Sequence, residues 1–255
     1  MTTDAPAADA PGNDPPAGGG MSLLDHLLEL RSRVTWMAVA VLAGMIVFFI
    51  PPIGFGTIEF LKQPALKENP EFMLQSISPM ENIVAYFRVA LLGGIALGMP
   101  VVIYQVMRFI HPALEHGEKK WVYPIVAGSS LAFIGGLAFG YYIVLRFAFG
   151  FLGKFGQEFA EINWTVSNYI DLTTRLLFVM GFVFETPIFI MGLAKFGVVN
   201  ARMLLGFWRY AIVLAFAFSA VATPTPDPIV QSLVAGPMVV LYFVGIGLAW
   251  LVRRD

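Results

Sequence analysis

Glu185 is the only formally charged residue in a stretch, 176–194, that otherwise has the composition of a membrane-spanning helix. An acidic side chain at the centre of such a helix costs about 2.5–3.5 kcal/mol on insertion scales, so it usually faces protein or a water-filled cavity. Pro187 removes one backbone donor nearby and weakens the helix. We therefore expect a kinked helix whose inner face lines a polar cavity. The alternative is a protonated carboxyl group bonded to a neighbouring helix.

Two short polar motifs lie beside apolar segments, and their charges could bind an ion or a charged ligand. The motif HLLELRSR contains Glu29 and Arg31, and the motif FIHPALEHGEKK contains Glu118. By itself the first motif also fits a basic membrane anchor with a solvated acid, and the second fits a solvated turn with paired charges. His26 and Glu29 share a helical face, but a metal site would need further ligands, and none is evident.

The composition favours a membrane protein over a soluble one. Of the 255 residues, 58% are hydrophobic and 13% are charged, which is more apolar surface than a soluble domain of this length usually buries. The chain has no cysteine, which excludes disulfides, thiolate metal sites and cysteine nucleophiles. No GxSxG, HExxH or Walker A pattern occurs, so neither an enzyme nor a cofactor is expected. A net charge of −1 gives no nucleic-acid signal.

Six apolar segments are candidate membrane spans, because about 20 apolar residues at about 1.5 Å each cross a hydrocarbon core of about 30 Å. The fifth segment would rise only about 20 Å, so it needs a thinned bilayer or an end covered by protein. We expect an all-α integral membrane protein with six transmembrane helices and a short fifth span. The segments are 34–50, 89–107, 121–145, 176–194, 210–222 and 229–252.

The distribution of basic residues predicts the orientation of the chain. Six spans place both termini on one side of the membrane, and ten lysines and arginines fall on that side against five on the other, with Arg88 unassigned. The positive-inside rule therefore places both termini in the cytoplasm. Residues 1–20 are rich in Ala, Pro, Gly and Asp, so we expect a disordered cytoplasmic tail ahead of a membrane domain over 21–255.

The loops on the side opposite the termini carry turn and cap signals. Two of them, 51–81 and 146–174, are long and contain apolar residues and prolines, so short helices that cap this face are expected. The third loop is a tight turn in which Asp227 precedes Pro228, which suits a helix N-cap followed by proline at the first helical position. Gln231 lies four residues after Asp227 and would share its helical face.

Two other classes of protein are compatible with these residues. A small secondary transporter could use Glu185 as a proton or ion site, although the internal repeat that many transporters carry is not visible. An intramembrane enzyme would need a nucleophile with its base, or a set of metal ligands, and the sequence offers neither.

Five motifs occur in the order found in the TatC family, the polytopic receptor subunits of the twin-arginine protein translocase. They are HLLELRSR, FIHPALEHGEKK, FGYY, FVFETP and ATPTPDPIVQSLVAGP. The chain resembles this family over about residues 21–254. The resemblance implies a concave, cup-like bundle in the bacterial cytoplasmic membrane. Such a receptor binds the twin-arginine signal peptides of folded proteins and nucleates an export complex driven by the proton motive force.

The partners that the resemblance implies are single-span, amphipathic-helix translocase subunits of the TatA/TatB type, membrane lipids and further copies of the receptor. In the family, two acids contact the signal-peptide arginines, and they map onto Glu29 and Glu118. A carboxylate can accept a guanidinium in bidentate fashion, which supports this assignment. Glu115 is a competitor for the second role, but Glu118 is directly followed by two basic residues, as the family acid is.

The remaining site residues also follow from the resemblance. The signal-peptide site would further include Arg31, Phe109, Pro112 and Leu114. Glu185 and Gln231 would line an intramembrane polar cavity, and Pro64, Tyr141 and Asp227 would make structural or partner contacts. One position departs from the family: Phe243 stands where many relatives carry an acid, so no role of that acid carries over.

Overall fold

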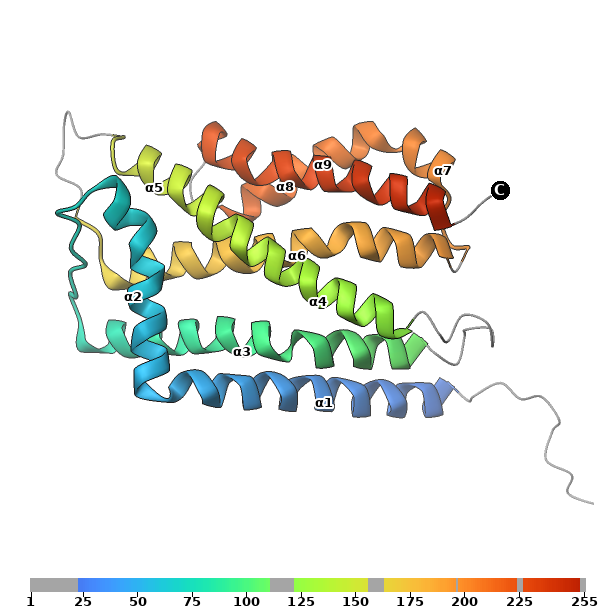
Figure 1. The fold of residues 1–255 in the computed structure, drawn as a ribbon, viewed down its shortest axis with the longest axis horizontal. Coiled ribbons are helices and arrows are strands. Elements are labelled where there is room, and N and C mark those ends of the chain that lie inside the picture. The colour runs from blue at the N-terminus through green and yellow to red at the C-terminus, as the bar shows by residue number, and fades with distance from the viewer. Residues whose placement is uncertain (1–22, 111–121, 156–162, 196, 224–226, 253–255) are drawn as a thin grey trace, which may run out of the picture.

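The computed structural model describes residues 23–110, 122–155, 163–195, 197–223 and 227–252 (Figure 1). These residues form helices and no β-strand, apart from one isolated bridge between Gln75 and Thr165. The all-α class expected from the sequence is therefore confirmed for the described residues. The elements are α1 (Leu23–Phe49), α2 (Pro51–Glu68), α3 (Pro79–Ile110), α4 (Val122–Phe139), the π-helical segment η3 (Gly140–Val144), α5 (Leu145–Leu152), α6 (Val166–Lys195), α7 (Ala201–Gly206), α8 (Trp208–Ala222) and α9 (Pro228–Val252).

The long helices α1, α3, α6 and α9 run side by side, and α4 crosses α3 and α6 obliquely (Figure 1). Helix α1 packs on α3, whereas α6 packs on α4 and α9, and α8 packs on α9. We call the end of the bundle where α1 begins and α9 ends the terminal end. The opposite end, where α2 and α5 lie and where α3 and α6 begin, is the α2 end (Figure 1).

Five helices are long and apolar enough to cross a membrane: His26–Phe49, Pro79–Phe109, Val122–Leu152, Val166–Lys195 and Pro228–Val252. Helix α8 is apolar but has only 15 residues, a rise of about 22 Å. The structure extends three helices well beyond the predicted segments, because α1 begins eleven residues before 34, α3 ten residues before 89 and α6 ten residues before 176. Hydropathy marks the most apolar part of a helix, whereas backbone hydrogen bonding continues into amphipathic turns that contain charged residues.

Two prolines set the sharp corner between α1 and α2. Helix α1 ends at Phe49, and Ile50 is extended with φ −66° and ψ 117° before Pro51 begins α2. A proline disfavours helical geometry at the residue before it but is tolerated in the first turn of a new helix. Helix α2 consequently leaves α1 at a steep angle and crosses the α2 end of the bundle (Figure 1). It is one of the capping helices that the sequence predicted there.

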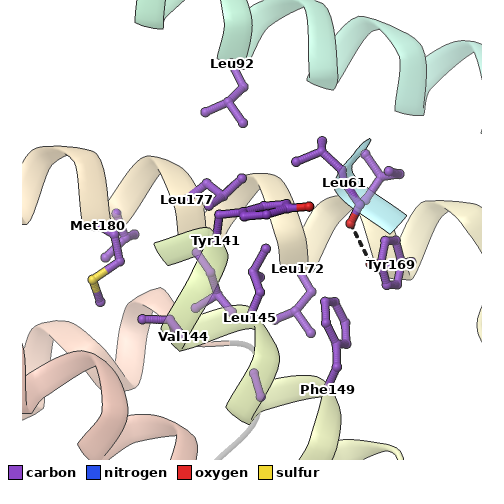
Figure 2. Close-up of a cluster of buried hydrophobic side chains, with 14 of the residues drawn as sticks. Leu61, Leu92, Tyr141, Val144, Leu145, Phe149, Tyr169, Leu172, Leu177 and Met180 are labelled. Carbon is purple, nitrogen blue, oxygen red and sulfur yellow. Dashed lines mark hydrogen bonds between the residues drawn. The ribbon is translucent and has the colours of Figure 1, made fainter. Parts of the chain in front are cut away.

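Most buried apolar side chains gather near the α2 end, where η3, α5 and α6 meet α2 (Figure 2). The π-helical segment joins α4 to α5 without a break, and the Leu145 N–H bonds to the Gly140 carbonyl five residues back. Tyr141, Val144, Leu145 and Phe149 face this core and are almost fully buried. From α6, side chains such as Tyr169, Leu177 and Met180 complete it (Figure 2).

Helices α4 and α6 are in close backbone contact at Gly136. A Cβ added there would overlap the Met180 carbonyl oxygen and would lie 2.9 Å from the Gly181 Cα. At the preceding residue, Gly135, the nearest atom to an added Cβ is Phe184 Cδ1 at 3.9 Å, which is an ordinary contact. The two adjacent glycines therefore offer a matched pair for testing the packing.

We expect Gly136→Ala to lower the free energy of unfolding by about 1–3 kcal/mol, because the methyl group meets backbone that cannot move aside. Gly135→Ala is expected to be neutral or slightly stabilising, since alanine favours the helix over glycine. Thermal unfolding of the two purified variants in the same detergent measures the difference. Equal midpoints would show that α4 and α6 do not pack as closely as the structure has them.

Candidate functional site

At the terminal end, Glu29 of α1 accepts a hydrogen bond from the Arg33 guanidinium at 2.8 Å, one helical turn away. The Arg33 and Glu29 side chains are 16% and 19% exposed, so the pair is partly shielded from solvent. Arg33 also donates to the Gln105 Oε1 of α3 at 3.4 Å. The carboxylate proposed to receive an incoming arginine therefore already holds a guanidinium of its own chain.

A second contact joins α1 to α3 at this end, where the His26 ring stacks on Phe109 with the ring centroids 4.5 Å apart. The structure thus places Glu29 and Phe109 along the same α1–α3 seam, whereas the Arg31 side chain is exposed. The predicted site residues Pro112, Leu114 and Glu118 lie outside the described residues. Among the described residues, no three histidines, aspartates or glutamates gather as a metal would require.

Sequence reasoning did not predict that Arg33 binds Glu29, or that Gln105 accepts a hydrogen bond from Arg33. Gln105 is a polar residue within an apolar stretch of α3, and its side chain is only 8% exposed. A polar side chain buried in a helix of this kind usually has a hydrogen-bond partner, and that signal could have indicated the contact. The partner itself is 72 residues away in sequence and could not be identified without the fold.

Glu185 lies on a cavity of about 420 Å³ between α3, α4 and α6. Its Oε1 atom is buried and makes no hydrogen bond to any described residue. The polar side chains on the cavity wall are Ser129, Glu185 and Thr186, and the others are apolar, among them Met99 and Phe182. The structure thus has a cavity at Glu185, but most of its lining is apolar, whereas a polar cavity was expected. Helix α6 continues through Pro187 to Lys195.

Gln231 does not line the Glu185 cavity, so the predicted grouping of these two residues is not found. It lies in the first turn of α9 instead, where its Nε2 donates to the Phe216 carbonyl of α8 at 2.9 Å. The Ser219 hydroxyl of α8 donates to the Gln231 carbonyl at 2.6 Å. Asp227 caps the same helix, because its Oδ2 accepts from the Val230 N–H at 2.9 Å. The predicted N-cap is confirmed, and Gln231 ties the short α8 to α9.

The TatC family model, described as Sec-independent protein translocase protein, matches residues 25–237. The chain belongs to the TatC family. The resemblance inferred from the motifs is confirmed, and with it the expectation of a protein translocase component that is not an enzyme.

Individual TatC proteins match nearly the whole chain. The TatC of Synechocystis sp. is 35% identical over 89% of this chain and 87% of its own length. The TatC of Aquifex aeolicus is 38% identical over 92% of this chain and 97% of its own length. A crystal structure of the twin-arginine translocase receptor TatC superposes with a TM-score of 0.79 at 38% identity, over 90% of this chain and all of that one. The multi-pass helical membrane architecture is thus shared with TatC.

In this TatC-family chain, Pro64 and Tyr141 act on the same carbonyl group. Pro64 lies inside α2 and has no N–H, so the Phe60 carbonyl four residues earlier lacks its helical donor. The Tyr141 hydroxyl donates to this oxygen at 2.8 Å, and its ring stacks on Phe60. Tyr169 makes a similar bond, at 2.8 Å, to the Leu61 carbonyl (Figure 2). The two tyrosines fix α2 across the α2 end.

Tyr141→Phe should lower the free energy of unfolding by about 1–3 kcal/mol, because the Phe60 carbonyl is left without a donor. Tyr169→Phe should have the smaller effect although Tyr169 is more deeply buried, since the helical pattern gives Leu61 a second donor four residues on. Adding Pro64→Ala to Tyr141→Phe restores an N–H and should recover part of the loss. Chemical unfolding in detergent measures all three, and the opposite ranking of the two tyrosines would contradict this account.

Proposed function

We propose that this TatC-family protein is the membrane receptor and core subunit of a twin-arginine translocase. It binds the twin-arginine signal peptides of folded proteins and nucleates the export complex, with the proton motive force as the energy source. The observation that carries the proposal is the match over 90% of the chain, at a TM-score of 0.79, to a twin-arginine translocase receptor.

The terminal end provides support for signal-peptide recognition. Glu29 has an acceptor geometry suited to a guanidinium, since it binds one from Arg33 at 2.8 Å. Glu118 is proposed as the second acceptor. It follows Phe109 by nine residues, a reach of at most about 32 Å, and Phe109 itself stacks on α1 beside Glu29. In this proposal Arg31, Pro112 and Leu114 complete the surface that receives the peptide.

The proposed setting is the bacterial cytoplasmic membrane, with six spans and both termini in the cytoplasm. The excess of basic residues on the terminal side, ten against five, supports this orientation. Helix α8 then counts as the short fifth span, and the Glu185 cavity is open to a docking helix. The proposed partners are single-span subunits of the TatA/TatB type, further copies of this receptor and membrane lipids.

Export of a folded reporter tests the function directly. In bacterial cells that lack their own receptor subunit but keep the single-span subunits, we expect this protein to restore export of a reporter with a twin-arginine signal peptide. The same reporter with both arginines changed to lysine should stay in the cytoplasm, because an ammonium group cannot reproduce the bidentate bond. Equal export of both reporters, or export of neither by correctly inserted protein, would contradict the proposal.

A further inference from the structure

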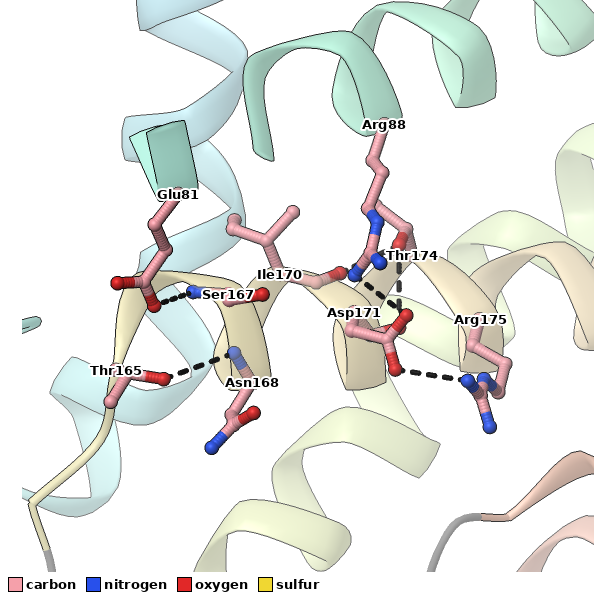
Figure 3. Close-up of polar contacts among 9 residues, drawn as sticks. All are labelled: Glu81, Arg88, Thr165, Ser167, Asn168, Ile170, Asp171, Thr174 and Arg175. Atoms are coloured by element: carbon pink, nitrogen blue, oxygen red, sulfur yellow. Dashed lines mark hydrogen bonds and ion pairs between the residues drawn. The ribbon is translucent and has the colours of Figure 1, made fainter. Parts of the chain in front are cut away.

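Three charged side chains form a cluster where α3 and α6 lie side by side (Figure 3). Asp171 of α6 accepts hydrogen bonds from Arg88 of α3 at 2.7 Å and from Arg175 of α6 at 3.0 Å. The side chains of Arg88, Asp171 and Arg175 are 38%, 32% and 42% exposed. Two guanidinium groups thus share a single carboxylate, which leaves one positive charge in excess.

The other acid near the cluster does not neutralise that charge. Glu81 accepts a hydrogen bond from the backbone N–H of Ser167 at 2.6 Å (Figure 3). It accepts another from the Ile77 N–H at 3.0 Å, so its carboxylate is occupied by the start of α6 and the turn before α3. In the described part of the chain, Asp171 is the only acid in an ion pair with either arginine. A guanidinium has five N–H donors, so each arginine keeps donors for a further acceptor.

The cluster forms one end of a groove of about 290 Å³. Each helix contributes four residues at the spacing i, i+3, i+4, i+7, which keeps them on one face. Both helices start at the α2 end, so the charged residues lie toward that end and the apolar ones toward the middle of the bundle (Figure 1). The lining residues are Arg88, Leu91, Leu92 and Ile95 of α3 and Asp171, Thr174, Arg175 and Phe178 of α6.

The position of the cluster along the helices matches a membrane boundary. Arg88 and Arg175 each lie nine residues after the first residue of their helix, a rise of about 14 Å. With 32 and 30 residues, α3 and α6 are about 48 Å and 45 Å long, against a hydrocarbon core of about 30 Å. If each helix is centred in the bilayer, its arginine lies close to the boundary of the hydrocarbon core. From there the long side chain can reach the headgroup layer.

We propose that this groove binds an anionic phospholipid from the leaflet at the α2 end. Its phosphate accepts hydrogen bonds from Arg88 and Arg175, and one acyl chain lies along Leu91 and Phe178, which are 45% and 38% exposed. The excess cation and the change from charged to apolar residues along the groove match the polarity of such a lipid. A structural ion pair between α3 and α6 would need only one arginine. The inference does not depend on the receptor role proposed above.

Native mass spectrometry of the full-length protein in detergent, titrated with phosphatidylglycerol or phosphatidylcholine, tests the proposal. We expect the anionic lipid to bind more tightly, and Arg88→Gln/Arg175→Gln to weaken its binding by about tenfold or more. Lys62→Gln/Lys67→Gln is the matched control, because it removes two positive charges from α2, at the same end of the molecule. Its affinity for the anionic lipid should be unchanged.

Asp171→Asn gives a result of opposite sign, because it removes the carboxylate that competes for both guanidinium groups. It should tighten binding of phosphatidylglycerol, whereas a purely structural ion-pair cluster would show no gain. Inorganic phosphate and glycerophosphoglycerol, which lack acyl chains, should compete poorly. Equal affinity for the two lipids, unchanged binding by the double arginine variant, weaker binding by Asp171→Asn or full competition by free phosphate would each overturn the proposal.

Discussion

Replacing Glu29 with glutamine is expected to weaken binding of a twin-arginine signal peptide at least tenfold. The amide keeps the size of the side chain but loses the negative charge, and hydrogen bonds to charged groups contribute about 1.5–3 kcal/mol. Since about 1.4 kcal/mol corresponds to a factor of ten in affinity, the loss should be measurable by titrating a fluorescent signal peptide into the purified protein in detergent. Unchanged affinity would remove Glu29 from the recognition site.

Arg33 provides the informative comparison, because its guanidinium binds Glu29 at 2.8 Å. If the incoming arginine competes for this carboxylate, Arg33→Leu should retain or increase the affinity for the peptide. If Arg33 instead holds Glu29 in its binding conformation, the same variant should lose affinity together with Glu29→Gln. A peptide in which lysines replace both arginines serves as the control and should bind weakly to every variant.

Glu185→Leu is expected to separate stability from function. Leucine removes the buried Oε1 atom, which has no hydrogen-bond partner among the described residues, but it also removes the hydrogen bond between the carboxyl group and Ser129, so the free energy of unfolding should rise by only about 1 kcal/mol. Export of a twin-arginine reporter should nevertheless fall at least tenfold, because the cavity loses its acid. Thermal unfolding in detergent and reporter export in receptor-deficient cells measure the two effects on the same variant.

Two further variants make the Glu185 experiment specific. Glu185→Gln keeps a polar side chain and distinguishes the need for charge from the need for polarity. Ile188→Leu changes the shape of the same cavity wall without changing its chemistry, and its export should stay close to normal. Full export by the leucine variant would show that the acid is incidental. A less stable leucine variant would show that the hydrogen bond with Ser129 contributes more to stability than the unpartnered oxygen costs.

The sequence predicted the helical elements well because the signals for them are local. Runs of apolar residues indicated the spans, and Asp227 before Pro228 indicated the start of α9. The beginnings of α3 and α6 were placed ten residues too late, because their first turns contain charged residues that lower the hydropathy. Composition thus locates the centre of a long helix more reliably than its ends.

The site was harder to predict because its contacts join residues distant in sequence. Helical spacing predicted that Gln231 shares a face with Asp227, but it could not show that Gln231 meets α8 instead of the Glu185 cavity. The partner of Arg88 could not be predicted, since Asp171 is 83 residues away in sequence. Each of these polar side chains requires a hydrogen-bond partner, but only the packing of the helices shows which residue that partner is.

The π-helical turn at Gly140–Val144 has a consequence for how the length of this region can vary. A π-turn holds one more residue than the α-helix it interrupts, so it rotates everything after it by roughly 100° relative to an uninterrupted helix. The inward-facing residues of α4 and α5 therefore do not follow one continuous α-helical spacing. The extra residue in the π-turn lets the inward faces of both helices point toward α6. A relative one residue shorter here would turn the counterparts of Leu145 and Phe149 outward, unless a compensating insertion followed.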